Sequence, residues 1–502
     1  MSKTQRYTLL TGILIIAIFL RFYHFTTTPP GLYPDEAMDG NNAVEVAETN
    51  HFQVFYVEDN GREGLYVNII AVILKVWPVY EPWIIRLPAA VAGVLTVWGL
   101  YLLVAELFGN GPGLLAAFLL ATSVWGIMFS RIGFRAILSP LMLIWALWLL
   151  IKAFRAGNKR MGILYACLAG IVYGLGFYTY IAYRITPLLF LLFIPFFRKI
   201  PGFWKRAGLF ILITFIVAAP IGWYFATNPG TFFGRTAEIS VTSAANPIHD
   251  FAVNIVKEAL MFNFHGDDNW RQNISGAPEL FWPVGILFIL GIVLGCYVLW
   301  QRRWWRKKQA DGGGTAPNAA SDRFPTFGVL LTLAWLVAGI LPAAASDEGI
   351  PHALRSILAL APALILATLG GVWLYDIIKK YWHARAAQAI AIIFLVIVAV
   401  FGYYDYFIVW AENPNVPGAF NANYVAIGEE INALPMSTAK YVVVNAGGVL
   451  ARGIPVPAET TMFITHSFTT ADAAAANVHY LLPNQTDQIP AGTPSADIFY
   501  IN

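Results

Sequence analysis

The sequence predicts an all-α, polytopic membrane protein with a small α/β domain at its C-terminal end. Of its 502 residues, 58% are hydrophobic and only 12% are charged, which is about half the charged fraction of an ordinary soluble domain. Such a composition is expected where much of the surface faces lipid. Aromatic residues make up 15% of the chain, including 17 Trp, and they suit belts of aromatic side chains at the two membrane interfaces.

Apolar runs long enough to cross about 30 Å of hydrocarbon at 1.5 Å per residue recur over the first 410 residues. About eleven spans are predicted, at 7–23, 84–107, 111–129, 136–153, 161–179, 185–197, 207–226, 281–300, 326–345, 353–374 and 387–410. The run from Leu65 to Val79 contains Asn68 and Lys75 and is interrupted by Pro78. It is expected to lie along the membrane interface, with a twelfth span as the alternative.

The distribution of charge predicts the orientation of these spans. With the N-terminus inside, more than half of the 32 Lys and Arg residues fall on the inner side, accompanied by few of the 29 acidic residues. The reversed orientation would place this charge on the wrong side of every loop. The 24–83 and 227–280 loops and the C-terminal segment are therefore expected outside, and the Gly-rich segment 311–321 is expected to be an inner linker.

The chain is accordingly divided into a membrane domain, residues 1–410, and a small extracytoplasmic domain, residues 411–502. The expected elements of the second are a helix near 425–434, strands at 440–444 and 461–465, an Ala-rich helix and a last strand at 498–501. Cys167 and Cys296 both lie in apolar runs. Neither a disulfide framework nor a metal cluster built on sulfur is expected from them.

The first candidate reactive groups follow the first span, in the segment Gly31-Leu-Tyr-Pro-Asp-Glu-Ala37. Asp35 can cap the helix expected over 37–48, and a capping acid on a hydrated loop is the structural interpretation of this motif. The position favours a functional one, because two carboxylates lie directly above the membrane edge, where the head of a lipid-linked substrate would lie. A carboxylate there can act as a general base toward an attacking hydroxyl, so Asp35 and Glu36 are candidate catalytic residues.

Arginines mark the next two outer connections. Arg131 and Arg135 lie four residues apart between the third and fourth spans, so on a helical turn they would share one face. They could snorkel to the interface, or they could clamp phosphate oxygens, which the planar guanidinium suits. Tyr183 and Arg184 stand at the outer end of the fifth span. Tyrosines there usually belong to an interfacial belt, whereas Arg184 adds another outer cation.

Two further outer clusters contain titratable residues. The first, within 261–273, holds His265, Asp267, Asp268 and Arg271. It has no second His, so hydrogen bonding within a loop is favoured over a metal site. In the second cluster, His352 and Arg355 are three apart and enter the tenth predicted span. A buried Arg in a span needs an anionic partner, and a lipid phosphate would supply one.

The sequence contains no Gly-rich nucleotide-binding loop and no Walker motif, and no soluble sugar-nucleotide domain is found. A group-transfer enzyme with this sequence would therefore need a donor that already sits in the membrane.

The order of these features resembles the GT-C membrane glycosyltransferases, specifically glycosyltransferase family 39, which includes dolichyl-phosphate-mannose–protein mannosyltransferases and the aminoarabinose transferases of lipid A. The resemblance covers about residues 5–410. It is carried by Tyr33-Pro-Asp-Glu-Ala37, by the segment 82–93 leading into the second span, by Arg131 and Arg135, and by His352-Ala-Leu-Arg355. Two segments depart from the family. Arg62-Glu63-Gly64-Leu65 replaces a Lys-Pro-Pro or His-Pro-Pro motif, and Ser139-Pro140 replaces an acid beside proline.

The resemblance implies a polyprenyl-phosphate sugar donor and a catalytic acid in the first loop, which corresponds to Asp35 with Glu36 beside it. The expected reaction is a single displacement that inverts the anomeric carbon, with Asp35 as base and arginines stabilising the departing phosphate. The expected phosphate-binding residues are Arg131, Arg135, Arg184, His352 and Arg355. The expected substrate-binding residues are Tyr33, Glu63, Tyr183, His265, Asp267, Asp268 and Arg271.

The acceptor could be a protein, a lipid or a glycan, and membrane lipids but no nucleic acid are expected partners. No cofactor is expected, although a divalent metal remains possible. The predicted location is a bacterial or archaeal cell membrane, with the active site and the C-terminus outside. Two alternatives are a transporter or flippase of lipid-linked sugars and a non-catalytic receptor or assembly subunit. Transporters place polar groups near the midplane, whereas here they cluster at one membrane edge.

Overall fold

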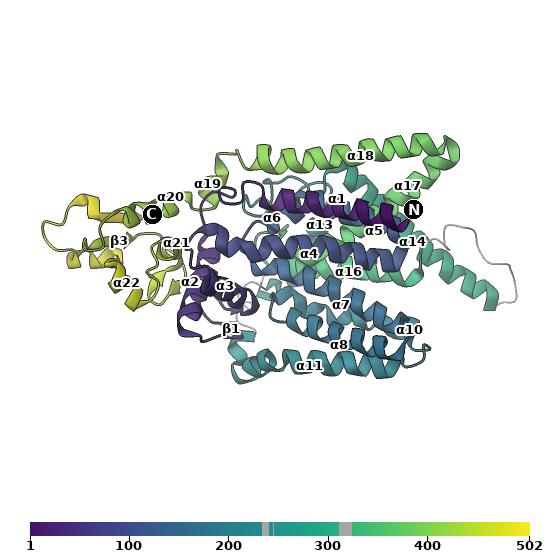
Figure 1. Cartoon of the computed structure of the whole chain (residues 1–502), viewed down its shortest axis with the longest axis horizontal. Helices are drawn as coiled ribbons and strands as arrows, with labels where there is room; N and C mark the ends of the chain where they lie inside the picture. Colours follow the sequence, from purple (N-terminus) through teal and green to yellow (C-terminus); the bar gives the residue numbers. More distant parts are fainter. Residues whose placement is uncertain (233–239, 244, 311–323) are drawn as a thin grey trace.

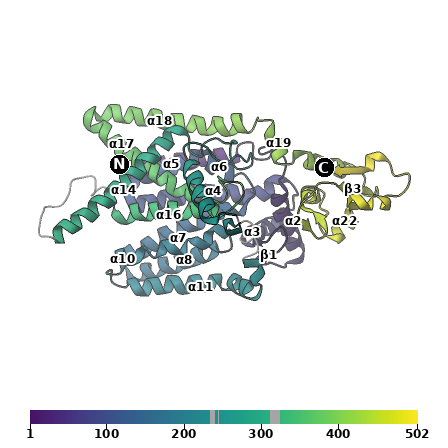
Figure 2. The same cartoon turned by 180° about the vertical axis from the view of Figure 1, so that it is seen from behind.

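A computed structural model describes residues 1–232, 240–243, 245–310 and 324–502 of the chain. The predicted linker at 311–321 lies outside these residues. The described part is mostly helical, and its long helices run side by side along the longest axis of the molecule (Figure 1). The N-terminus lies at the end of the bundle that is far from the C-terminal segment, and the C-terminus lies within that segment, as the view from behind also shows (Figure 2).

Eight helical segments of the described chain are long and apolar enough to cross a membrane. They coincide with all or most of α1 (Lys3–Phe22), α4 (Pro82–Phe108), α7 (Leu138–Arg155), α11 (Phe203–Thr227), α14 (Trp282–Ala310), α16 (Thr326–Ala344), α17 (Leu360–Tyr381) and α18 (Ala384–Tyr404). A polytopic, mainly helical fold is thereby confirmed.

The three other predicted spans also coincide with helices, in shorter or less apolar pieces. They are α5 (Asn110–Thr122) with α6 (Val124–Phe129), α8 (Lys159–Gly176), and η2 (Ile181–Ile185) with α9 (Pro187–Phe190) and α10 (Phe193–Phe197). The predicted span 111–129 is divided into α5 and α6 because the Ser123 hydroxyl accepts the Gly126 N–H and so caps a new helix. The number of helices that cross the membrane remains a prediction.

Non-spanning elements gather at one end of the helical bundle, which we call the loop end (Figure 1). They are α2 (Pro34–Thr49), the antiparallel hairpin of β1 (Phe55–Tyr56) and β2 (Arg62–Glu63), and α3 (Leu65–Val76). The predicted helices over 37–48 and from Leu65 are both present. The second outer loop supplies α13 (Pro247–Leu260), which packs against α16 through hydrogen bonds from Asn254 to the carbonyls of Ala344 and Ser346.

The segment after α18 extends beyond the loop end (Figure 1). Its helices are α19 (Asn415–Ala419), α20 (Ala422–Ala433), α21 (Glu459–Ile464) and α22 (Thr470–Ala476). Its parallel sheet has the strand order β6 (Val478–Leu481), β3 (Lys440–Val444) and β7 (Ile498–Ile501). Two further short strands, β4 (Leu450–Ala451) and β5 (Ile454–Pro455), pair in an antiparallel hairpin. The central strand places Val442 opposite Tyr480 and Phe499.

The strand predicted at 461–465 is wrong, because these residues belong mainly to α21 and its end. Its β-branched residues favour a strand, but tertiary hydrogen bonds override that preference. The Thr460 hydroxyl donates to the Leu32 carbonyl at 2.8 Å, and the Thr461 hydroxyl donates to the Tyr424 carbonyl at 3.2 Å. Both bonds are buried, and they attach α21 to the first loop and to α20.

The helix α2 is held between the bundle and the C-terminal segment. Met38 of α2 belongs to the apolar core of the C-terminal segment, whereas Phe463 of α21 belongs to the core of the bundle. The two helices approach closely at Gly40, where an added Cβ would lie 2.8 Å from the Phe463 ring. The Asn41 amide also donates to the Glu459 carboxylate at 2.7 Å. Residues near the start of α2 are thus fixed from two sides.

Candidate active site

The start of α2 is held by Glu36. The helix begins after Tyr33 with Pro34 in its first turn, where proline's fixed φ and missing N–H are tolerated. The Tyr33 N–H donates to the Glu36 carboxylate at 3.3 Å, so Glu36 makes the capping contact that the sequence suggested for Asp35. The side chain of Asp35, the next residue after Pro34, is half-buried.

Glu36 is fully buried and paired with Arg86 of α4. Two Arg86 nitrogens donate to the two Glu36 oxygens at 2.9 and 3.1 Å, and the Gly133 N–H adds a third bond at 2.7 Å. Arg86 also donates to the carbonyls of Pro29 and Gly31. This network joins the first loop, α4 and the turn before α7, and it fixes the direction in which α2 leaves the membrane edge.

A second face of α2 carries Asp35 and Asp39, which are four residues apart and therefore neighbours on the helix surface. Asp39 is buried and forms an ion pair with Arg62 of β2. Burial raises the pKa of Asp39, and the positive charges of Arg62 and Arg135 oppose part of this shift. Both arginines therefore lie close to the face of α2 that carries Asp35 and Asp39.

Glu63 bridges two arginines from different helical connections. Its carboxylate accepts Arg135 Nε at 3.2 Å and a terminal nitrogen of Arg184 at 3.3 Å, while Glu63 itself is 3% exposed. Arg184 also donates to the Phe232 carbonyl at 3.0 Å, and its guanidinium lies 4.3 Å from the centre of the Phe232 ring. The structure thus unites three predicted site residues, Glu63, Arg135 and Arg184, next to Asp39 of α2.

Arg131 lies in a different environment from Arg135. Its side chain is buried and donates to the carbonyls of Leu20, Tyr23, His24 and Thr28 at 2.7–3.2 Å and to the Tyr406 hydroxyl at 3.2 Å. A cation is favourable beside the carbonyl end of a helix, and here it stabilises the end of α1. The two arginines that the sequence placed on one face have separate partners.

The loop that contains Arg271 reaches the start of α2. The Arg271 guanidinium lies 3.7 Å from the centre of the Tyr33 ring, a favourable cation–π geometry. Burial raises the pKa of Tyr33, the negative charge of Asp35 raises it further, and Arg271 opposes the shift. Tyr33, Asp35 and Arg271, all predicted from the sequence, therefore share one neighbourhood.

A second group of carboxylates lies where the 261–280 loop meets the segment before α17. The buried Asp267 carboxylate accepts the Ala353 N–H at 2.9 Å and lies 3.7 Å from the His352 imidazole. Glu258 of α13, also buried, accepts the His352 N–H at 2.8 Å and the Ser356 hydroxyl at 2.6 Å. Burial raises the pKa of Asp267 to about 6 and that of Glu258 to about 7.

The remaining predicted residues are more peripheral. His265 and Asp268 are exposed and pair with each other at 3.2 Å. Arg355 is half-buried and donates to the Glu348 carbonyl at 2.8 Å. It precedes α17 instead of entering it, because η4 (Ile357–Ala359) separates the two, so the prediction that it enters a span is wrong.

Tyr183 is fully buried, and its hydroxyl lies against Gly176 of α8, where an added Cβ would approach it to 2.4 Å. Within the described residues, this hydroxyl has no hydrogen-bond partner. The ring is therefore part of the packing between η2 and α8.

Sequence reasoning did not assign roles to Asp39, Arg62, Arg86, Glu258 or Glu279. A role for Arg86 could have been inferred from the sequence, because an arginine in an apolar span requires a partner. The sequence around Glu279 has no comparable feature that indicates a role. It is buried beside Asp267, whose N–H donates to it at 3.2 Å, and burial raises its pKa well above the usual value.

The arrangement places the half-buried Asp35 on the helix face whose next acid, Asp39, is paired with an arginine. Asp35 lies one helical turn before Asp39, and the arginines around Asp39 and Glu63 are Arg62, Arg135 and Arg184. A carboxylate can remove a proton from an attacking hydroxyl, and guanidinium groups can stabilise a negatively charged leaving group. The geometry therefore suits transfer of a group from an anionic carrier to a nucleophile.

Parts of the sequence are similar to known proteins. Residues 65–224 match the family described as dolichyl-phosphate-mannose-protein mannosyltransferase. A Bacillus subtilis protein named as a candidate mannosyltransferase, YkcB, is 36% identical over 113 residues, which are 22% of this chain and 15% of that protein. The chain thus spans a small part of the length of this relative.

Solved structures share the fold over nearly the whole chain. ArnT from Cupriavidus metallidurans, determined with bound undecaprenyl phosphate, has a TM-score of 0.57 at 13% identity, covering 95% of this chain and 90% of that one. The oligosaccharyltransferase of Archaeoglobus fulgidus, tethered to an acceptor peptide, has a TM-score of 0.55 at 14% identity, covering 96% of this chain and 64% of that one. Another structure of that archaeal enzyme, AglB, holds an inhibitory peptide and a dolichol phosphate and has a TM-score of 0.54 at 14% identity, covering 96% and 65%.

Proposed function

We propose that this chain, a membrane protein with the GT-C fold and a family 39-like sequence, is a glycosyltransferase that takes a sugar from a polyprenyl phosphate. The observation that carries the proposal is the position of Asp35 one helical turn before Asp39, which pairs with Arg62, together with the two arginines, Arg135 and Arg184, that Glu63 holds. The fold similarity to enzymes solved with polyprenyl phosphates supports the same donor class.

The proposed phosphate-binding pair is Arg135 and Arg184. Both are only partly buried, with side chains 13% and 22% exposed, and each gives a bond to the same carboxylate. Glu63 would hold the two guanidinium groups in place before the donor arrives, and a phosphate could then compete for their free donor positions. Arg131 has its nitrogens directed at α1 and Tyr406, so it would support the site through the fold.

In the proposed reaction, the acceptor hydroxyl oxygen attacks the anomeric carbon while the bond from that carbon to the phosphate oxygen breaks. The hydroxyl proton passes to Asp35, and the polyprenyl phosphate leaves with its negative charge next to the arginines. A single displacement of this kind inverts the anomeric configuration. In this proposal, proton transfer to Asp35 comes late, as the leaving group departs.

Glycan analysis in cells tests the activity for any sugar and any acceptor class. Cells lacking the chain are complemented with wild type, with Asp35→Asn or with Asp487→Asn, which removes an exposed acid of the C-terminal segment. Mass spectrometry then compares their protein-, lipid- and glycan-linked sugars. We expect one class of glycan to disappear in the deletion strain, to return with wild type and Asp487→Asn, and to stay absent with Asp35→Asn.

Purified proteins provide the quantitative test. Asp35→Asn keeps the shape of the side chain but removes the proton acceptor, so turnover of the identified donor should fall by about 10²–10⁴-fold. Its thermal midpoint should remain close to that of wild type. Transfer by purified Asp35→Asn at the wild-type rate would contradict the catalytic role and favour a transporter of lipid-linked sugars.

A further inference from the structure

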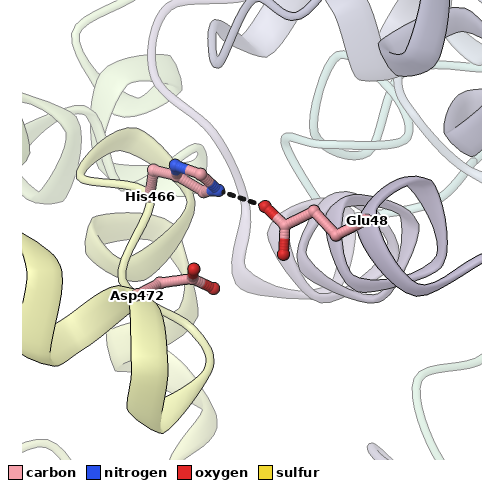
Figure 3. A group of neighbouring side chains, drawn as sticks. All are labelled: Glu48, His466 and Asp472. Carbon is pink, nitrogen blue, oxygen red and sulfur yellow. Dashed lines mark hydrogen bonds and ion pairs between the residues drawn. The ribbon is translucent and has the colours of Figure 1, made fainter.

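A histidine and two carboxylates converge where α2 meets the C-terminal segment (Figure 3). Glu48 comes from the last turn of α2, His466 follows α21, and Asp472 lies in the first turn of α22. His466 Nε2 is 2.8 Å from a Glu48 oxygen, and one potential ligand atom from each of the three residues lies within 4.8 Å of the others. Figure 3 shows the imidazole and both carboxylates turned toward one another.

From this geometry, we propose that Glu48, His466 and Asp472 bind a divalent metal ion of the zinc type that fastens the C-terminal segment to α2. One imidazole nitrogen and two carboxylate oxygens form a three-residue ligand set that zinc accepts, with water as the fourth ligand. Magnesium and calcium prefer sites built from oxygen alone. This proposal does not depend on the transferase activity.

The spacing of the ligand atoms is compatible with one bound ion. Zinc held tetrahedrally at about 2.1 Å from each ligand would separate neighbouring ligand atoms by about 3.4 Å. His466 Nε2 and the Glu48 oxygen are 2.8 Å apart, and all three ligand atoms lie within 4.8 Å of one another. The His466 and Glu48 side chains are 34% and 40% exposed, so water can reach the remaining coordination position.

Neighbouring groups orient two of the ligands. The Tyr80 ring stacks on the His466 imidazole with centroids 4.2 Å apart and planes 14° from parallel. The Thr469 hydroxyl donates to one oxygen of Asp472 and accepts the Asp472 N–H at 3.1 Å. Such contacts around a metal ligand hold it in the binding orientation.

The electrostatics of the site favour a cation. Glu48 and Asp472 bring two carboxylates within 4.8 Å of each other and of the His466 imidazole nitrogen. The nearby Arg452 is paired with Glu45 and Glu58. A bound dication would neutralise the two carboxylates and would replace the hydrogen bond between His466 Nε2 and the Glu48 oxygen with a bond from each atom to the metal.

The metal would have a structural role. At 1.5 Å per residue, α2 separates Glu48 from Asp35 by about 20 Å, so the ion would lie far from the proposed reaction centre. It would join helix α2 to a segment that follows it by more than 400 residues in the sequence. Binding should therefore stabilise the folded chain, with a gain in unfolding free energy that grows with the logarithm of zinc concentration above the dissociation constant.

Calorimetric titration of the full chain tests the site. The protein is purified in detergent, its affinity tag is removed, and bound metal is stripped with a chelator before ZnSO4 or MgCl2 is added. We expect one zinc per chain, a rise in thermal midpoint with zinc, and affinity for zinc at least tenfold higher than for magnesium. Asp472→Asn and His466→Gln should each lower zinc affinity by about tenfold or more and abolish the rise in midpoint.

Matched controls separate the site from other ligands on the surface. His479→Gln removes an exposed histidine, and Asp487→Asn removes an exposed acid of the same segment; both should bind zinc as wild type does. Asp472→Asn removes one proposed metal ligand and leaves the hydrogen bond between His466 and Glu48 intact. It therefore distinguishes the effect of metal binding from the effect of that hydrogen bond. Equal zinc binding by wild type, Asp472→Asn and His466→Gln would overturn the proposal, and so would equal affinity for magnesium and zinc.

Discussion

Asp35 and Glu36 are adjacent carboxylates whose environments differ because successive residues of a helix point in different directions. Glu36 points toward α4 and is enclosed by Arg86 and the Gly133 N–H. Asp35 points toward the face shared with Asp39 and remains half-buried. Glu36 therefore has the environment of a structural ion pair, and Asp35 has the access that a general base requires.

Replacement of Glu36 should affect the stability of the folded chain more than its activity. Glu36→Gln would leave the buried Arg86 without its charged partner, and breaking such a pair costs about 3–5 kcal/mol. We expect a clear fall in the thermal midpoint of the purified protein. Glu45→Gln on the same helix breaks a partly exposed pair with Arg452 and should cost about 1 kcal/mol or less. Equal midpoints for Glu36→Gln and wild type would contradict the structural role of Glu36.

Kinetic measurements should distinguish the role of Arg131 from the roles of Arg135 and Arg184. Arg135→Ala and Arg184→Ala each remove a charge-assisted contact and should weaken donor use by about 1–3 kcal/mol. Arg131→Ala should chiefly lower the thermal midpoint, because its nitrogens are directed at the end of α1. Donor kinetics and thermal unfolding are measured for all three variants. A loss of donor use in Arg131→Ala at unchanged stability would instead assign Arg131 a direct contact with the phosphate.

At the scale of elements, α13 and the segment before α17 are joined through two carboxylates whose pKa values are raised by burial. Glu258 accepts bonds from the His352 N–H and the Ser356 hydroxyl, and Asp267 accepts the Ala353 N–H. Desolvation opposes ionisation of both acids more strongly than these bonds favour it. The connection between these elements should therefore depend on pH.

The expected pH dependence follows from the direction of the shift. The pKa of Glu258 is raised from 4.5 to about 7 in the folded chain, so the folded chain retains a proton that the unfolded chain releases between these values. The resulting stabilisation is complete below pH 4.5 and is lost as pH rises toward 7. It amounts to at most about 3 kcal/mol, since one unit of pKa is about 1.4 kcal/mol.

Thermal midpoints at pH 5 and pH 8 measure this effect. The fall in midpoint from pH 5 to pH 8 should be smaller in Glu258→Gln than in wild type, because the amide does not ionise. Glu430→Gln, at an exposed position of α20, should retain the wild-type dependence. The assignment fails if both variants show the same fall.

For the molecule as a whole, the loop end and the C-terminal segment should face outward. This orientation is predicted from the charge distribution, and the structure places α2, α3 and the C-terminal segment at one end of the bundle (Figure 1). Single cysteines test it, at Gly157 in a predicted inner loop and at Ser275 in a predicted outer loop. Cys167 and Cys296 are first replaced by Ala. Both test positions are exposed.

A membrane-impermeant maleimide should label Ser275→Cys in intact cells and Gly157→Cys only after permeabilisation. The chain without cysteine serves as the control for background labelling. Labelling of both positions from the same side would contradict the topology, and labelling of Gly157→Cys alone in intact cells would reverse it.

The sequence by itself determined the helical membrane architecture. Long apolar runs must satisfy their backbone hydrogen bonds internally when they lie in lipid, and this requirement is local, so all eleven predicted runs coincide with helices. The strand at 440–444 and the last strand at 498–501 were predicted for a similarly local reason, since each is a short apolar segment between turns. The candidate role of Asp35 at the start of α2 was likewise predicted from its place after the first span, and it stays a prediction.

Only the tertiary structure decided which charged residue meets which. Arg131 and Arg135 differ by one helical turn in sequence, yet one caps α1 and the other binds Glu63. Periodicity specifies which residues share a helix face, but it does not specify the partner across the fold. The same reason applies to Glu48 and His466, which meet only because α21 packs against α2. Ion pairs between distant segments depend on how helices pack, and that packing is decided by the whole apolar core.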